Sequence, residues 1–521
     1  MSVRVRLPLL RRVVKVASGG VIGSAVGISW YFLHRNDYDL SSLGAMRLGR
    51  AAYAAVRIFV DYKWVMYGAD REAAEYEANI KEAHKRSAER LLRLACANGG
   101  VWIKVGQHLG AMEYILPVEY TSTMSVLHSR APQSSYEDIC RVIRDDLKIE
   151  ASEIFSEFDR NPIGAASLAQ VHKATLTDGR VAAVKVQHPR VKPHSLVDMQ
   201  TMEFLVNIAA YLFPEFRLMW LVEETKRNLP RELDFLHEAK NQDAVRRMFA
   251  HFSWLKIPEV YWDWCSDRVL VQEFCDGGEV NNLDYFRANQ ISGSDVCHKL
   301  GQLYSEMIFV KGYMHCDPHP GNVLVRKHPT EKTEIVLLDH GLYLTLHENF
   351  RLQYANFWLC LLSGDLNGIK HWASKMNVGD LYGLFACMVA KRSWQSVTKG
   401  NISKTEATAG ELAEIQAYVG SLLPQISDVL ERVPRPLILI LKTNDLLRSI
   451  EFRLGTQANA YSFTEMSRFC VRAVRDQSYR ECRSTLCRWK VSLLAWTALL
   501  RIYLYERLTE LLALFGLAAA V

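Results

Sequence analysis

HCDPHPGNVLV, residues 315–325, places two histidines, a cysteine and an aspartate within five residues. These residue types suit both zinc ligation and general acid–base chemistry. His315 and His319 have the i, i+4 spacing of a helical zinc motif. However, Pro318 and Pro320 flank His319, so no regular helix can present both rings on one face. The sequence therefore argues against a zinc site here.

The spacing around this segment is instead typical of phosphoryl transfer. Asn322 follows Asp317 by five residues, and Asp339 opens an Asp-His-Gly turn 22 residues after Asp317. In phosphoryl-transfer sites with this order, the first aspartate positions the nucleophile or accepts its proton, while the asparagine and the second aspartate hold Mg²⁺ against the phosphates. We predict a catalytic role for Asp317 and a magnesium site at Asn322 and Asp339.

Features further upstream fit the same chemistry. Lys185 lies in the apolar, alternating segment VAAVKV, where a lysine is costly to bury unless an acid or a phosphate meets it. A lysine at a sheet edge that extends to solvent is the alternative. The small-residue turn GAAS, residues 164–167, allows backbone N–H groups to approach a polyphosphate. Glu238, in the helical pattern ELDFLHEAKN, can hold Lys185 as an ion pair.

Composition narrows the class of protein. The 521 residues are 49% hydrophobic and 23% charged, which is ordinary for a globular chain long enough for two or three domains. The formal net charge of +6 is small and its basic residues are scattered, which argues against a dedicated nucleic-acid binder. Eleven cysteines without a C-x-x-C pair indicate neither a disulfide framework nor a zinc module, so we expect mostly buried reduced thiols.

The N-terminus indicates targeting. Residues 1–15 carry five basic side chains and no acid, which suits a mitochondrial targeting segment. Residues 16–33 are free of charge over 18 positions, at the short end of a bilayer span. We predict a single membrane anchor here and a location at the mitochondrial inner membrane. A secretory signal peptide and a soluble, glycine-weakened helix are the alternatives. For the apolar tail, charges interrupt residues 493–521, which favours an amphipathic helix packed on the domain or lying on a membrane over a second span.

Several longer motifs resemble a known family. KVGQHLG at 104–110, LPVEY, PIGAASLAQVHKATLTDGRVAAVKVQHP, ELDFLHEAKN, HCDPHPGNVLV and LLDHG are similar to the signature motifs of the UbiB family of atypical kinases, also called aarF-domain-containing kinases. The resemblance runs from about residue 85 to 345 and continues more loosely to about 455. It implies an α+β, two-lobed protein-kinase-like fold with an N-terminal helical extension, here combined with a single N-terminal transmembrane helix.

With the resemblance, the chain divides into five expected parts. They are a targeting segment and anchor (1–35), a helical extension with the K-x-G-Q motif (36–150), an N-lobe (151–276), a C-lobe (277–480) and an apolar amphipathic tail (481–521).

The resemblance also implies roles for residues that are unremarkable in isolation. Lys104 of K-x-G-Q would enter the active site and meet Glu232 and Asp234 of an E-x-D motif, where a protein substrate would otherwise lie. Lys185, paired with Glu238, would contact the nucleotide phosphates. The expected site is therefore catalytic Asp317, Lys185, Glu238, Lys104, Glu232 and Asp234; nucleotide-binding Gly164, Ala165, Ala166, Ser167, Lys185 and Glu273; and metal-binding Asn322 and Asp339.

Some positions depart from kinase patterns. An ordinary protein kinase has G-x-G-x-x-G where this chain has residues 164–167, and no A-P-E follows the Asp-His-Gly turn. The family typically has alanine at the position of Gly164, and a glycine there widens the backbone freedom of the loop. His340 replaces the phenylalanine of ordinary kinases, and we expect a packed imidazole without a chemical role.

The function implied by the resemblance is Mg-ATP binding with ATPase activity or phosphoryl transfer to a small molecule or lipid. It would support mitochondrial lipid or coenzyme Q homeostasis and membrane organisation. The expected cofactors are ATP and Mg²⁺, and the expected partners are nucleotide, mitochondrial lipids or quinones and mitochondrial membrane proteins, without nucleic acid. One alternative is a catalytically weak pseudokinase that regulates or scaffolds membrane proteins. The other is a Ser/Thr protein kinase, which ranks lowest because Lys104 would fill the cleft.

Overall fold

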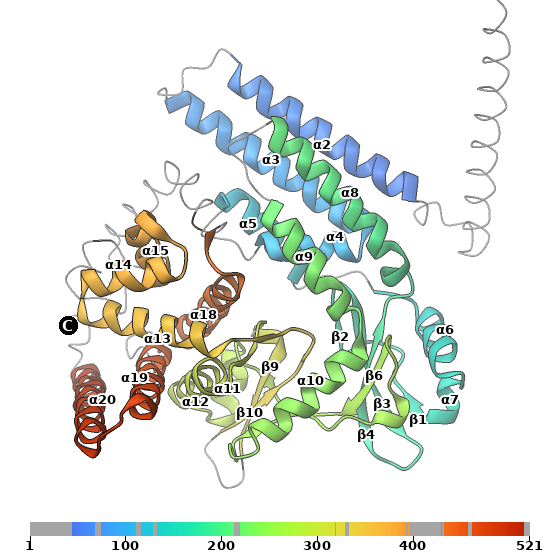
Figure 1. Ribbon diagram of the computed structural model, residues 1–521. Coiled ribbons are helices and arrows are strands. Elements are labelled where there is room, and N and C mark those ends of the chain that lie inside the picture. Colours follow the sequence, from blue (N-terminus) through green and yellow to red (C-terminus); the bar gives the residue numbers. More distant parts are fainter. Residues whose placement is uncertain are drawn as a thin grey trace, which may run out of the picture. The chain divides into compact units, whose positions relative to one another are not determined.

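The chain forms two compact units, which are described separately below (Figure 1). The first unit comprises residues 1–151, 159–172 and 185–227, and the second comprises residues 152–158, 173–184 and 228–521. The computed structural model describes residues 44–67, 74–110, 116–128, 133–212, 219–317, 319–328, 333–390, 394, 429, 432–456 and 461–514.

Helices dominate the first unit, as the sequence predicts for residues 36–150 wherever the structure describes them. Helix α2 packs against α3 and α8, and α3 also packs against α4 and α5. The helical elements are α2 (Gly44–Met66), α3 (Ala74–Asn98), α4 (Val101–Gly110), α5 (Val118–Met124), η2 (Ser125–His128), α6 (Tyr136–Leu147) and α8 (Val191–Leu212). Two further helices, α7 (Ala151–Ile154) and α9 (Met219–Glu232), cross from one unit into the other along the chain.

A buried ion pair joins α2 to α8 in the first unit. The guanidinium of Arg47 forms two hydrogen bonds to the carboxylate of Asp198, at 2.7 and 2.5 Å, and both residues are at most 5% exposed. Arg47 also donates to the backbone oxygen of Asn98 at the end of α3 over 2.6 Å. One side chain therefore ties three helices together, and each charge depends on the other for its burial.

The first sheet contains the hairpin expected from the sequence. Its strand order is β1-β3-β4-β6, with β2 paired to β3. The turn between β3 and β4 is tight: Leu176 N donates to Arg180 O at 2.8 Å, and Gly179 adopts a φ of 88° that glycine tolerates without strain. The strands are β1 (Phe155–Phe158), β2 (Gly164–Ala165), β3 (Ala169–Leu176), β4 (Val181–Gln187) and β6 (Val269–Glu273).

The second unit adds two smaller sheets. One has the strand order β5-β10-β9-β7, and the other pairs β8 with β11. The antiparallel pair β9 and β10 runs from Glu334 opposite Arg326 to Leu337 opposite Val323, which confirms the two short strands predicted from GNVLV and EIVLLDHG. The strands are β5 (Leu255–Lys256), β7 (Gly278–Glu279), β8 (Tyr313–His315), β9 (Val323–Arg326), β10 (Glu334–Leu337) and β11 (Tyr343–Thr345).

Helices form the rest of the second unit. They are α10 (Phe235–Met248), η3 (Trp262–Trp264), α11 (Leu283–Asn289), α12 (Gly293–Ser305), the π-helical turn η4 (Glu306–Lys311), η5 (Pro320–Asn322), α13 (Glu348–Ser363), α14 (Leu366–Lys375), η6 (Gly379–Leu381), α15 (Tyr382–Ala390), α18 (Arg435–Arg453), α19 (Tyr461–Glu481) and α20 (Thr485–Leu514).

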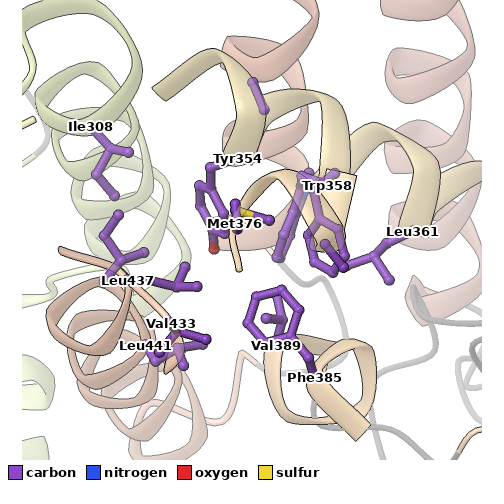
Figure 2. Close-up of a cluster of buried hydrophobic side chains, with 14 of the residues drawn as sticks. Ile308, Tyr354, Trp358, Leu361, Met376, Phe385, Val389, Val433, Leu437 and Leu441 are labelled. Carbon is purple, nitrogen blue, oxygen red and sulfur yellow. The ribbon is translucent and has the colours of Figure 1, made fainter. Parts of the chain in front are cut away.

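A large apolar core holds α13, α14, α15, α18 and α19 together (Figure 2). Trp358 of α13 is buried, and its indole N–H donates to Ser467 Oγ of α19 at 3.2 Å, so the polar atom of this side chain is satisfied. Leu437 and Leu441 of α18 belong to the same core. Because these two leucines pack in the core, they fix the orientation of α18 about its own axis. They therefore also fix the position of Lys442, which follows Leu441.

One expectation requires correction, and another needs a detail added. The expected transmembrane helix is wrong as far as the structure describes the chain, because no described helix is long and apolar enough to cross a membrane; the segment 16–33 itself lies outside the described residues. The expectation of mostly reduced thiols is confirmed, although only four of the free thiols are buried, and one pair, Cys482 and Cys487, forms a disulfide where α19 connects to α20. The other nine cysteines are free. A five-residue separation without C-x-x-C spacing gave no signal for this bond.

The buried ion pair gives a stability prediction. Arg47→Ala leaves the Asp198 carboxylate buried without its cation, so we expect a loss of about 3–5 kcal/mol in the free energy of unfolding. The double variant Arg47→Met with Asp198→Leu removes both charges, so its free energy of unfolding is expected to decrease much less. Chemical denaturation monitored by circular dichroism measures both. Equal losses in the single and double variants would contradict this account.

Candidate active site

The segment after β8 brings the first predicted acid and the predicted asparagine together. Asp317 follows β8 by two residues, and Asn322 ends η5, immediately before β9. The side-chain amide of Asn322 donates to the backbone oxygen of Asp317 at 3.2 Å. Leu338 N, next to Asp339, donates to Asn322 O at 2.8 Å. The loop and the end of β10 therefore form one hydrogen-bonded unit that carries all three predicted residues.

His315 connects this loop directly to Asp339. Its ring is 1% exposed, and Nε2 lies 2.8 Å from the backbone oxygen of Asp339. Because a carbonyl only accepts, Nε2 carries the hydrogen, and Nδ1 accepts from the Tyr304 hydroxyl at 2.8 Å. Burial lowers the pKa of His315 below 6.5, which favours this neutral ring. His315 is thus a structural link between the two aspartate segments, which the sequence analysis did not anticipate.

The Asp-His-Gly turn is held from several sides. Asp339 has a left-handed φ of 38°, and its Oδ1 accepts from Gly341 N at 3.1 Å. Glu238, 2% exposed on α10, accepts from His340 N at 3.3 Å. Asn241, one turn further along α10, donates to His340 O at 2.9 Å. Side chains of α10 therefore bind both the backbone N–H and the backbone carbonyl of His340 in the turn.

The ring of His340 is packed, as expected. The side chain is 0% exposed, and its Nε2 lies 3.1 Å from the backbone oxygen of Leu337, to which it donates. Its Nδ1 lies 2.9 Å from the Tyr343 hydroxyl, and the two rings are parallel. Both ring nitrogens are occupied by protein partners, so His340 serves the fold of the turn.

Lys442 is a site residue that the sequence analysis missed. Its Nζ lies 3.0 Å from Oδ1 of Asp317, although 125 residues separate the two in the chain. Both side chains are partly exposed, at 21% and 31%. Lys442 follows the buried Leu441 on α18, so the apolar core holds the cation beside the carboxylate. The only sequence signal was a lysine directly after the apolar run LILIL, the same kind of signal that singled out Lys185.

The residues present fit a magnesium ion. Mg²⁺ prefers oxygen ligands and is usually held by one or two carboxylates together with substrate phosphates. The bond from Asn322 to Asp317 uses the amide nitrogen, so the amide oxygen is the atom suited to a cation. Asp339 adds a carboxylate on the adjoining segment. The donor set therefore agrees with the predicted metal ligands, whose roles stay predictions.

In the first unit, the K-x-G-Q glycine has a packing role. A Cβ on Gly106 would lie 2.4 Å from Leu127 Cδ1 and 3.6 Å from Met124 Sδ, so a glycine lets α4 approach α5 and η2 closely. Lys104 lies on the same short helix. Glycine at position 164 has no such constraint, since an added Cβ would meet nothing within 4 Å. An alanine would therefore fit at this position.

The remaining predicted residues lie in both units. Lys185 lies on β4 between the buried Val184 and Val186. It belongs to the first unit, as do Lys104 and residues 164–167, whereas Glu232, Asp234 and Glu238 belong to the second. The expected pairings of Lys185 with Glu238, and of Lys104 with the E-x-D motif, therefore stay predictions.

Two of the predicted acids have structural partners within the second unit. Asp234 caps the N-terminus of α10, where its side chain accepts from His237 N at 3.1 Å. Glu273 forms an ion pair with Lys256 at 2.7 Å and accepts from Glu259 N at 3.1 Å. These contacts show that both carboxylates stabilise local structure, and their expected roles in the site stay predictions.

Comparison with known proteins identifies the family. A family model described as the ABC1 atypical kinase-like domain matches residues 126–373. AarF domain-containing kinase 1 of Drosophila melanogaster is 50% identical over 91% of this chain and 91% of its own length. AarF domain-containing protein kinase 1 of Mus musculus is 49% identical over 97% and 96%, respectively.

The chain belongs to the AarF domain-containing family of ABC1 atypical kinase-like proteins. The family prediction is therefore confirmed, and the matched domain supports a kinase-type enzyme with a kinase-like fold. Among solved structures, the Rv3197–erythromycin complex from Mycobacterium tuberculosis shares 23% identity at a TM-score of 0.41, covering 68% of this chain and 98% of that chain.

A polar network lies beside the predicted nucleotide loop in the first unit. His172 of β3 is 0% exposed, and its Nδ1 donates to Asp159 O at 2.7 Å. Its Nε2 accepts from the amide of Gln170 at 2.9 Å, and Gln170 in turn accepts from Ser134 N at 2.8 Å. The network requires a neutral imidazole, and burial lowers the pKa of His172 below 6.5.

This network predicts how stability depends on pH. Because the pKa of His172 is lower in the folded state, the unfolded chain binds the proton first as the pH falls below about 6.5. The free energy of unfolding should therefore decrease between pH 7.5 and 5.5, and His172 contributes at most about 1.4 kcal/mol per pH unit to that decrease, the amount for one proton. His172→Gln should reduce this slope, whereas the exposed His371→Gln should leave it unchanged. Denaturation at several pH values measures it, and equal slopes in wild type and His172→Gln would contradict the prediction.

Proposed function

We propose that this protein binds Mg-ATP and hydrolyses it or transfers its terminal phosphoryl group to a small molecule or lipid. The observation that carries the proposal is the hydrogen-bonded arrangement of Asp317, Asn322 and the Asp339 turn in the second unit. These residue types, in this order, are those of phosphoryl-transfer sites. Membership of a kinase-like family supports the same chemistry.

The residues of the second unit divide the work in this proposal. Asp317 positions the attacking hydroxyl or water and accepts its proton. Lys442 acts as a positioning residue, because its ammonium holds one carboxylate oxygen of Asp317 at 3.0 Å and so fixes the direction of the other. The same ammonium adds positive charge where negative charge develops on the transferring phosphoryl group. Glu238 and His315 hold the Asp339 turn in place.

Asn322 and Asp339 would hold the magnesium ion in this scheme. When bound, the ion would neutralise charge on the phosphate oxygens. In the first unit, Lys185 and residues 164–167 would bind the phosphates through the ammonium and the backbone N–H groups. At Gly164 an added Cβ would meet nothing within 4 Å, so there is open space beside the first residue of that loop.

A non-protein substrate is favoured by the K-x-G-Q helix. If Lys104 enters the site as the family resemblance implies, it takes the space that a protein substrate needs. The basic, acid-free residues 1–15 support a mitochondrial location. We therefore propose a role in mitochondrial lipid or coenzyme Q homeostasis and membrane organisation. The competing role is a nucleotide-sensing regulator without turnover.

Substitutions at Asp317 and Lys442 test the proposal. Asp317→Asn should lower the turnover of Mg-ATP by at least about 100-fold, because the proton acceptor is lost. Lys442→Met should lower it by about tenfold or more. Neither should change the Mg-ATP dissociation constant more than about threefold, since neither is assigned to nucleotide binding. Phosphate release and thermal stabilisation by Mg-ATP measure the two quantities separately.

Lys375→Met is the matched control, because it removes an exposed lysine at the end of α14 in the same unit. It should leave turnover and binding unchanged. Mg-ATP binding without any turnover in the wild type would favour the regulator. Undiminished turnover in Asp317→Asn would contradict the proposed mechanism.

A further inference from the structure

The outer face of α20 carries a continuous row of exposed apolar side chains. Trp489 is 76% exposed and Trp496 is 59% exposed, which is unusual for the largest apolar residue type. We call this row the α20 stripe; its members are Leu486, Trp489, Leu493, Trp496, Leu500 and Tyr503. Successive members are alternately three and four residues apart, so they lie along one face of the helix. At 1.5 Å per residue the stripe extends for about 26 Å.

The opposite face of α20 is fixed to the body of the second unit. Helix α20 packs against α19. Glu506 of α20 is buried and forms an ion pair with Arg468 of α19. The disulfide between Cys482 and Cys487 closes the connection where α20 begins. These contacts fix the orientation of α20 about its own axis. The stripe therefore faces away from α19.

The exposed charges of α20 that the structure describes all have one sign. Among its described side chains, the exposed charged residues are Arg488, Lys490, Arg501 and Arg507, and the acidic Glu506 is buried against Arg468. Lys490 and Arg501 are eleven residues apart, or three turns, so they lie along the same edge of the stripe. The surface thus combines an apolar centre containing tryptophan and tyrosine with a basic edge.

We propose that the α20 stripe docks on a bilayer surface that carries anionic lipid headgroups. Tryptophan and tyrosine favour the boundary between headgroups and acyl chains, where the ring is apolar and the polar tip is hydrated. Each lysine or arginine close to an anionic surface adds to the attraction, and its long side chain can reach the headgroups. The helix lies along the surface and does not cross it, in agreement with the absence of a spanning helix among the described residues.

The basic side chains beside the stripe argue against a second copy of this chain as the partner that covers it. The three- and four-residue spacing also suits a helix–helix seam, but stable seams carry complementary charges at their edges. Two copies packed through the stripe would bring the basic edges with Lys490 and Arg501 close together, and the described side chains of α20 offer no exposed acid to pair with them. An anionic surface complements the same edge. The inference does not depend on the nucleotide chemistry proposed above.

Oxidative footprinting of the full-length protein tests the proposal at the level of single side chains. The probe is a vesicle of phosphatidylcholine with about one-third phosphatidylglycerol, compared with phosphatidylcholine alone. Oxidation of Trp489 and Trp496 should fall at least about fivefold with the anionic vesicles and much less with the neutral ones. Trp262, 41% exposed in the same unit, should stay reactive and serves as the internal control.

Charge reversal supplies the second arm. The double variant Lys490→Glu with Arg501→Glu should raise the vesicle concentration that half-protects Trp489 from oxidation by at least about tenfold. Lys370→Glu with Lys375→Glu makes the same charge change on α14 and should have no effect. Equal protection by neutral vesicles, or no protection by either, would overturn the proposal. Protection that grows with protein concentration in the absence of vesicles would show that a second copy covers the stripe. Low reactivity of Trp489 and Trp496 in dilute protein without vesicles would show that another segment of this chain covers it. Either result would also overturn the proposal.

Discussion

The buried carboxylate of Glu238 is the constraint on which the candidate site depends. A carboxylate that is 2% exposed is unfavourable unless its oxygens are hydrogen-bonded or paired. One of these oxygens accepts from His340 N, and a Cβ on Gly341 would lie 3.6 Å from the other. That distance is ordinary van der Waals contact, whereas Oδ1 of Asp339 would lie closer, at 3.2 Å, so the glycine mainly leaves room for the aspartate of its own turn. The hydrogen bond from His340 N to this buried carboxylate therefore helps to hold the turn that carries Asp339.

The same turn is bound from its other side by His315, so the left-handed backbone of Asp339 is over-determined by its neighbours. The Asp339 turn is therefore held rigidly, which suits a reaction that depends on positioning and electrostatics. Lys442 extends this principle to Asp317, because a helix anchored in the apolar core supplies its cation. Fixed charges at fixed distances need no reorganisation during the reaction.

Local features of the fold were predictable from sequence because they depend on near neighbours. The turn at Gly179 and the strands around Asn322 follow from apolar runs and turn residues. The contacts that complete the structure are not local: Arg47 meets Asp198 across 151 residues, and Lys442 meets Asp317 across 125. No spacing rule identifies such pairs in a single sequence. The grouping of Asp317, Asn322 and Asp339 was predictable because these residues are close in sequence, whereas no spacing indicated the buried hydrogen bonds of His315.

The proposed function requires that Asn322 and Asp339 form one divalent-cation site that binds metal together with ATP. Titration of Mn²⁺, as a spectroscopic substitute for Mg²⁺, with and without ATP measures this directly through the electron paramagnetic resonance signal of free Mn²⁺. We expect ATP-dependent Mn²⁺ binding that Asp339→Asn weakens by about tenfold or more, with Asp380→Asn at an exposed carboxylate as an unaffected control. Identical Mn²⁺ binding by the wild type and Asp339→Asn would contradict it.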